Sequence, residues 1–141
     1  EEPVWELHIE TEISYHSQDI ITIAISTYEF KGGAHGNDKI KFLNLDAKTG
    51  YILTQSAIVD TSEDFIKLAQ TYFLKNLKTT NEQMKMEDYC FGEAFQLPEN
   101  IGFSNDGLVL LYNVYEVASY AQGYTEFVIP FEEVNSYLKV N

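Results

Sequence analysis

The first part of the chain alternates between apolar and polar residues with the period of a β-strand. The positions on one side are Trp5, Leu7, Ile9, Thr11, Ile13 and Tyr15, and those between them are Glu6, His8, Glu10, Glu12 and Ser14. This period of two predicts an antiparallel strand with one buried face. A polar turn at 17–19 and a second β-rich run over 20–30 complete a predicted hairpin.

The pattern then changes from a strand period to a helical one. A strand is predicted over 39–46, and turn residues over 46–50 return the chain into 51–53. Apolar residues next recur at helical spacing over 60–78, at Phe65, Leu68, Ala69, Tyr72, Phe73 and Leu77. Asp60 or Thr61 is the expected N-cap of this helix, with an acidic residue three positions later.

The last third of the chain reads as strands followed by a short helix. The Asn105-Asp106-Gly107 turn precedes a continuous apolar run over 108–112, which is typical of a central strand. A further strand is predicted over 125–129, and Pro130 suits the start of a short helix. The predicted fold class is therefore α+β: an antiparallel sheet of hairpins packed by one long helix and a short C-terminal helix, in a single domain of residues 1–141.

Charge narrows the range of partners. The 141 residues include 22 acidic and 9 basic side chains, and the net charge is −13. All of the basic residues are lysines. Such a chain repels nucleic acid, whose affinity for proteins comes mainly from phosphate neutralisation. No stretch approaches the roughly 20 apolar residues of a transmembrane helix, so we expect no membrane insertion by this chain, with any anchor lying outside it.

Signals for catalysis or for a cofactor are weak in this sequence. His8 and His16 would lie roughly 26 Å apart on one strand, so no metal site is predicted and no cofactor is expected. The single cysteine, Cys90, reads as a small apolar side chain beside Tyr89 and Phe91. Among the many carboxylates, Glu116 is the most interesting, because it precedes an irregular loop. Its simplest role is to accept hydrogen bonds from loop N–H groups.

Two loops are the candidates for recognition. One holds three glycines in five residues over 32–36, and the other carries Tyr115, Tyr120 and Tyr124. A tyrosine offers a large contact area and a hydrogen-bonding tip, so the second loop could bind a protein groove or a sugar face. The alternative is that these rings anchor their loop to the core.

Several motifs together resemble a known bacterial family. They are Gly32-Gly33-Ala34-His35-Gly36-Asn37, Asn44-Leu45-Asp46 with Thr49-Gly50, Phe95-Gln96-Leu97-Pro98, Asn105-Asp106-Gly107-Leu108, Tyr115-Glu116-Val117-Ala118-Ser119-Tyr120-Ala121-Gln122-Gly123 and Ile129-Pro130. In this order they resemble the uncharacterised extracytoplasmic domain shared by RsiV-type anti-sigma factors and PdaC-type peptidoglycan deacetylases. The resemblance runs from about Tyr28 to Leu138. It implies a family module over 31–141, with the hairpin of 1–30 similar to the end of the domain that usually precedes it.

The resemblance also implies a location and a role. The location is extracytoplasmic: periplasmic, on a surface lipoprotein, or secreted. The role is non-catalytic, since a separate domain carries the chemistry in such deacetylases, and in RsiV-type proteins this region is a receptor for lysozyme. Relatives often have proline where this chain has Ser119.

We therefore expect a non-catalytic envelope binding or sensor module, with a basic protein such as lysozyme or a cell-wall glycan as its partner. The expected contact residues are Gly33, His35, Asn37, Tyr115, Glu116, Tyr120 and Tyr124. This interpretation requires the two loops to meet in space. The alternatives are a hydrolase of cell-wall polymers that uses Glu116 and His35, and a structural spacer without a ligand.

Overall fold

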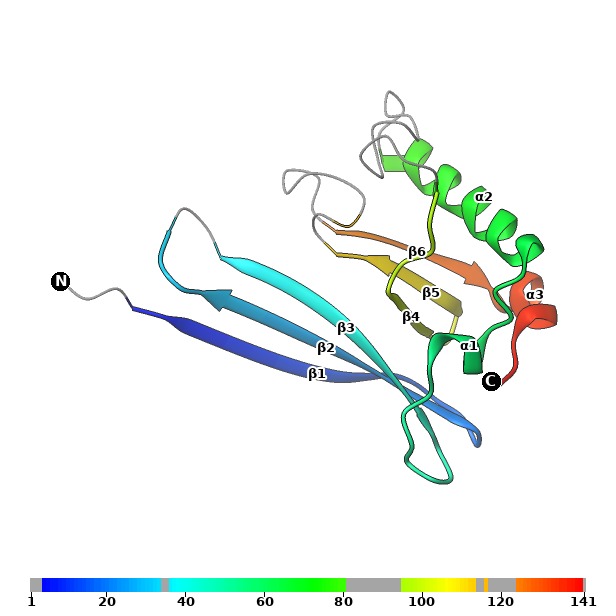
Figure 1. The fold of residues 1–141 in the computed structure, drawn as a ribbon, viewed down its shortest axis with the longest axis horizontal. Helices are drawn as coiled ribbons and strands as arrows, with labels where there is room; N and C mark the ends of the chain where they lie inside the picture. The colour runs from blue at the N-terminus through cyan, green and yellow to red at the C-terminus, as the bar shows by residue number, and fades with distance from the viewer. Residues whose placement is uncertain (1–3, 34–35, 81–94, 114–115, 117–123, 141) are drawn as a thin grey trace.

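The computed structural model describes residues 4–33, 36–80, 95–113, 116 and 124–140, and these form two three-stranded antiparallel sheets with a few helices (Figure 1). The first sheet has the order β1 (Glu6–His16), β2 (Ile20–Phe30), β3 (Asn37–Asp46), and the second has the order β4 (Asn100–Phe103), β5 (Gly107–Tyr112), β6 (Thr125–Pro130). The helices are α1 (Gln55–Ile58), α2 (Glu63–Thr80) and α3 (Phe131–Val134), followed by the 3₁₀ turn η4 (Asn135–Tyr137). The α+β class is confirmed, but the prediction of one sheet is wrong, because the strands divide into two.

The first sheet departs from its predicted burial. Leu7, Ile9 and Ile13 are exposed by 60%, 59% and 62%, so the apolar side of β1 is not a buried face. The register of β1 on β2 shifts between Ile13 and Tyr15. This irregularity turns Tyr15 toward the core, where its ring stacks 5.4 Å from that of Phe103. The prediction that the apolar residues from Trp5 to Tyr15 share one buried face is therefore wrong. The bulge could not be predicted, because it does not change the alternation of apolar and polar residues.

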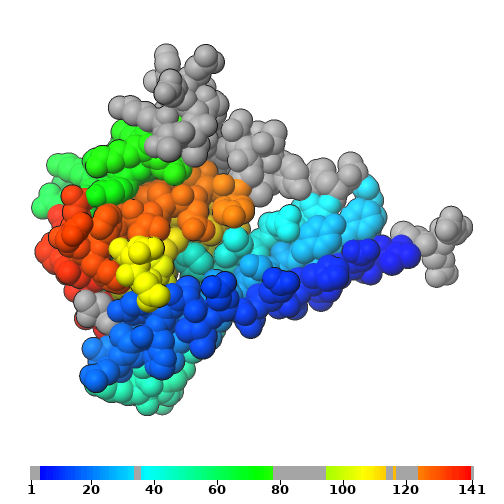
Figure 2. Space-filling model, turned by 180° about the vertical axis from the view of Figure 1, so that it is seen from behind, coloured from blue at the N-terminus to red at the C-terminus, as the bar shows by residue number. Residues whose placement is uncertain are grey.

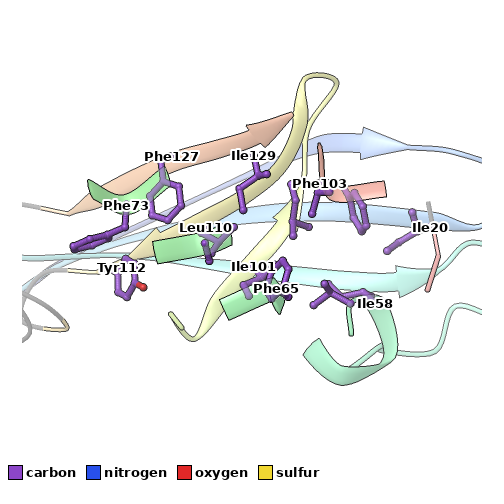
Figure 3. Packing of buried hydrophobic residues seen from close by; sticks show 14 of the residues in the cluster. Ile20, Ile58, Phe65, Phe73, Ile101, Phe103, Leu110, Tyr112, Phe127 and Ile129 are labelled. Atoms are coloured by element: carbon purple, nitrogen blue, oxygen red, sulfur yellow. The ribbon is translucent and has the colours of Figure 1, made fainter. Parts of the chain in front are cut away.

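The main core lies between α2 and the second sheet. The apolar stripe of α2 is buried at Phe65, Ala69, Phe73 and Leu77, as its spacing predicts. Phe73 makes edge contacts with Tyr112 and Phe127, with ring centroids 5.5 Å and 6.0 Å away (Figure 3). The helix begins later than predicted. Ser62 accepts a hydrogen bond from the Phe65 N–H at 3.4 Å, which makes Ser62 the N-cap rather than Asp60 or Thr61.

The two sheets are joined through side chains. The edge of β4 that faces away from β5 is bonded to side chains of the first sheet. The Phe103 N–H donates to the Thr22 hydroxyl at 3.1 Å, and the Ile101 carbonyl accepts from the Asn44 amide at 2.8 Å. The Thr22 hydroxyl in turn donates to Asn44 at 2.7 Å, so the polar groups of this buried contact satisfy one another. A β-carbon at Gly102 would lie 2.8 Å from the Thr22 methyl group, which explains a glycine at this crossing.

The chain passes from the first sheet to the second through residues 47–99, which include α1 and α2. Residues 51–53, predicted to return as a strand, make only an isolated antiparallel bridge between Ile52 and Leu45. The helix α1 and the strand β4 were not predicted, because each spans only four residues and shows no clear period. The first sheet extends beyond the second, and the strand ends farthest from α3 project from the body (Figure 1). Ile40 of β3 lies beside Asn113, the residue that follows β5.

Candidate functional site

The described roots of the two candidate loops lie side by side. Asn113, which follows β5, accepts a hydrogen bond from the Ile40 N–H at 2.8 Å and donates one to the Ile40 carbonyl at 2.8 Å. Ile40 is three residues beyond Asn37, where β3 leaves the glycine loop. Asn113, at the root of the loop after β5, is therefore joined to β3 three residues beyond the root of the glycine loop.

Glu116 holds the first turn of the loop that follows β5. Its carboxylate accepts hydrogen bonds from the Asn113 N–H at 2.6 Å and the Glu99 N–H at 3.4 Å. The Glu116 N–H donates back to the Asn113 carbonyl at 3.0 Å. This is the loop-organising role considered for Glu116, and both carboxylate oxygens are engaged in it. Asn113 is thus fixed from the loop side by Glu116 and from the sheet side by Ile40.

The glycine loop has the backbone that its composition suggests. Gly32 and Gly33 adopt φ angles of 83° and 115°, which side chains rarely tolerate. Gly36 is buried, and a β-carbon there would collide with the ring of Tyr28. Asn37 is exposed at the first position of β3, opposite Glu29 of β2. Gly33 and Asn37 are therefore available at the surface, while Gly36 packs against the sheet.

Tyr124 precedes β6, next to Asn113 at the same end of the second sheet. The last paired residues of β5 and β6 are Tyr112 and Thr125, so Asn113 and Tyr124 are the next residues beyond the ladder. The Tyr124 side chain is 54% exposed. Within the described part of the chain, no hydrogen bond or ring contact joins Tyr124 to Gly33 or Asn37. The structure thus brings the loop roots together without a direct contact between these side chains.

Two polar residues of this region were missed by the sequence reasoning. Asn113 ends the apolar run of β5, and Glu126 interrupts the apolar residues of β6. Glu126 is paired with Leu111 across the ladder, and partial burial raises the pKa of its carboxyl group. A glutamate inside a strand pattern was the available signal for Glu126. Nothing in the sequence places Asn113 against β3, because that contact joins positions 73 residues apart.

The remaining predicted site residues, His35, Tyr115 and Tyr120, lie outside the described residues, as does Cys90. In the ranges that the structure covers, no group of three His, Cys, Asp or Glu side chains could hold a metal ion. Across the same ranges, every helix is too short or too polar to cross a lipid bilayer. What the described site offers is a pair of fixed loop roots, exposed amide and phenol groups, and two carboxylates.

Comparison with known proteins identifies relatives of the same fold. The family model described as "Protein of unknown function (DUF3298)" matches residues 52–132. No curated protein matches the chain significantly. A DUF3298 family protein from Pseudomonas aeruginosa has a similar crystal structure, with a TM-score of 0.75 and 24% identity over 98% of this chain. A DUF3298 family member from Bacteroides fragilis has a TM-score of 0.74 and 25% identity over 95% of this chain.

Those two proteins are longer than the part that matches. The chain spans 64% of the Pseudomonas aeruginosa protein and 54% of the Bacteroides fragilis protein. The family match begins after the glycine-loop motif and includes the later motifs, from Phe95-Gln96-Leu97-Pro98 to Ile129-Pro130.

Proposed function

Because the chain belongs to the DUF3298 family, whose function is unknown, we propose that it is a non-catalytic binding module of the bacterial cell envelope, and that it holds a basic protein partner at the joined roots of its two loops. The observation that carries the proposal is the double hydrogen bond between Asn113 and Ile40. A contact surface built from two loops needs roots whose relative position is fixed, and this bond together with Glu116 fixes them.

The exposed groups at the roots suit recognition better than chemistry. Tyr124 presents its ring at the surface, and Asn37 presents an amide at the start of β3. Both oxygens of Glu116 accept backbone hydrogen bonds, which favours a positioning role for this residue. The net charge of −13 would steer a basic protein toward the module. The resemblance to RsiV-type and PdaC-type proteins supports the extracytoplasmic location and makes a lysozyme-like protein the first partner to test.

Calorimetric titration tests this proposal directly. The chain is titrated with a basic lysozyme and, separately, with soluble peptidoglycan fragments, at low and at physiological salt. Saturable binding of the lysozyme at physiological salt supports the protein partner, whereas saturable binding of the fragments alone replaces it with a glycan. Heat that disappears at physiological salt in both titrations indicates general charge attraction. In that case the spacer alternative replaces the binding module.

Variants locate the contact. Tyr124→Ala and Tyr120→Ala should each weaken binding about tenfold or more, as expected for tyrosines near the centre of an interface. Tyr51→Ala is the matched control, because Tyr51 is 75% exposed in the 46–53 turn region, away from the loop roots. Equal losses in all three variants would contradict the assignment of the site. Degradation of peptidoglycan that stops in Glu116→Gln would favour the hydrolase alternative instead.

A further inference from the structure

The outer edge of β1 is a second surface, distinct from the loop roots. Among the described strands, β1 pairs only with β2, and it forms one margin of the first sheet. It runs for 11 residues along the outside of the projecting arm (Figure 2). A long unpaired edge strand is a template for another strand, and proteins usually shorten, cover or charge such edges.

The hydrogen bonds of β3 show which backbone groups of β1 face outward. Ile40 directs its N–H and carbonyl to Asn113, away from β2. Ile40 and Ser26 of β2 therefore form a non-hydrogen-bonded pair. The backbone N–H and carbonyl of Ser26 then point the other way, toward Glu10 of β1, with which Ser26 forms a hydrogen-bonded pair. Before the bulge, the outward backbone groups of β1 are therefore those of the odd-numbered residues: Leu7, Ile9, Thr11 and Ile13.

The side chains of β1 give this edge two different faces. The odd-numbered residues share one face with Ile21, Ile23, Ile25, Leu43 and Leu45, none of which belongs to the buried core. Toward the start of β1 the same face also carries Thr27, Glu29, Lys39 and Lys41. We call this surface the apolar face. The even-numbered residues lie on the opposite face, where Glu6, Glu10 and Glu12 are exposed. A strand added to this edge would meet apolar side chains on one face and carboxylates on the other.

We propose that the outer edge of β1 binds an extended segment of a partner protein, in which apolar and basic residues alternate. The partner would hydrogen-bond to the outward groups of the odd-numbered residues and extend the apolar face with its own apolar side chains. Its basic residues would stand opposite Glu6, Glu10 and Glu12. With the added strand, these three positions would form the non-hydrogen-bonded pairs, in which side chains approach most closely. Attraction between opposite charges is therefore strongest there.

The same geometry disfavours a second copy of the chain. In any antiparallel pairing of two β1 edges through their outward groups, even-numbered residues face even-numbered residues. In the register that places Glu6 opposite Glu12, each glutamate would oppose a glutamate or His8 of the other copy at the closest spacing. The net charge of −13 on each copy adds to this repulsion. The charge pattern therefore favours a basic partner strand over self-association.

Trp5 provides a local reporter for the test. It is the only tryptophan of the chain, it immediately precedes β1, and it is 68% exposed. The probe is a short acetylated and amidated peptide in which valine and lysine alternate, long enough to span Glu6 to Ile13. Calorimetry measures its affinity, and a blue shift of the Trp5 emission reports binding at this edge. A scrambled peptide of the same composition is the first control, and a peptide alternating valine and glutamate is the second.

Variants separate the strand contact from general attraction. Thr11→Pro removes an outward N–H, a change that an edge strand tolerates, and it should weaken the alternating peptide about tenfold or more. The triple change Glu6→Gln, Glu10→Gln and Glu12→Gln should also weaken it about tenfold. The matched control Glu63→Gln, Asp64→Asn and Glu132→Gln removes three exposed acidic groups elsewhere and should change affinity less than about threefold. The triple change Glu6→Lys, Glu10→Lys and Glu12→Lys should transfer the preference to the valine–glutamate peptide.

The outcomes are decisive in either direction. Preference for the alternating peptide over the scrambled one, with loss in Thr11→Pro, supports strand addition. Equal binding of both lysine peptides, or no binding at all, overturns it, and so does a dimer of the free chain that Thr11→Pro dissociates. Tyr124→Ala should leave peptide binding unchanged. The proposal at the loop roots and the proposal at β1 can therefore fail independently.

Discussion

The carboxamide of Asn113 binds both backbone groups of Ile40, so a single side chain occupies the place that another strand would take at the edge of β3. Further along the same edge, the Phe42 N–H donates to the Asn100 side chain at 2.9 Å. The edge of β4 is satisfied in return by side chains of the first sheet. The two sheets therefore satisfy each other's edges without sharing a backbone ladder.

Removal of the Asn113 carboxamide should destabilise the protein. Asn113→Ala leaves two backbone groups of Ile40 without a partner, and we expect a loss of about 1–3 kcal/mol in the free energy of unfolding. Urea unfolding followed by circular dichroism measures the loss. The control is Asn135→Ala, at an exposed asparagine, for which a change within about 0.5 kcal/mol is expected. Similar values for both variants would contradict the bridging role.

Gly102 should resist even a small side chain. A β-carbon there would lie 2.8 Å from the Thr22 methyl group and 3.0 Å from the Phe42 ring. Gly102→Ala is therefore expected to destabilise the protein by about 1–3 kcal/mol through overpacking between the sheets. Adding Thr22→Ser removes the methyl group and keeps the hydroxyl, so the double variant should recover part of the loss. A loss that Thr22→Ser only deepens would show that space at this crossing is not the cause.

Much of the fold followed from periodicity, and the parts that did not have physical reasons. The stripe of Phe65, Ala69 and Phe73 and the run of β5 were predictable, because burial imposes their spacing directly. The division into two sheets was not, since it depends on side-chain bonds between positions far apart in the sequence. The apolar face misled the prediction for the opposite reason: its pattern is that of a buried surface, but no described element covers it.

The candidate site was predictable only in part. The composition of the two loops pointed to Gly33, Asn37 and Tyr124, and the structure places these residues at the surface. The hydrogen bonds between Asn113 and Ile40 could not be predicted, because a single asparagine after a strand has no distinctive sequence pattern. Glu116 was recognised as a carboxylate that could cap a loop, but its connection to Glu99 requires the tertiary fold.

Tyr72 should make stability sensitive to alkaline pH. Its hydroxyl donates a hydrogen bond to the Glu133 carboxylate, and this bond raises the pKa of Tyr72 from 10.0 to about 12. Because the pKa of Tyr72 is higher in the folded state than in the unfolded state, its hydrogen bond contributes fully to the free energy of unfolding at pH values below the unfolded-state pKa. This contribution is lost as the pH rises from 10.0 to about 12. Because the pair lies near solvent, the loss should stay below about 1 kcal/mol.

Tyr72→Phe tests the origin of that alkaline loss. The variant should be less stable than the original chain at neutral pH and should lose less stability across the alkaline window. Thermal unfolding at several pH values measures both effects. Tyr51→Phe is the control, because Tyr51 is 75% exposed and its hydroxyl has no hydrogen bond to any described residue. An identical alkaline loss in Tyr72→Phe and in the original chain would assign the pH dependence to other groups.

Glu126 should have the opposite effect on stability at neutral pH. Burial raises the pKa of its carboxyl group above the ordinary value of 4.5, so the folded state holds the proton more tightly than the unfolded state. The charged carboxylate therefore destabilises the folded state at pH values above the folded-state pKa of Glu126. This destabilisation disappears as the pH falls toward the unfolded-state pKa and the group is protonated. Glu126→Gln should therefore raise the melting temperature at neutral pH, by less than about 3 °C for a partly exposed group. The gain should shrink as pH falls and disappear below 4.5. Glu132→Gln, at an exposed position of α3, is the control and should show no such trend, whereas a gain for Glu126→Gln that stays constant with pH would show that packing rather than charge is responsible.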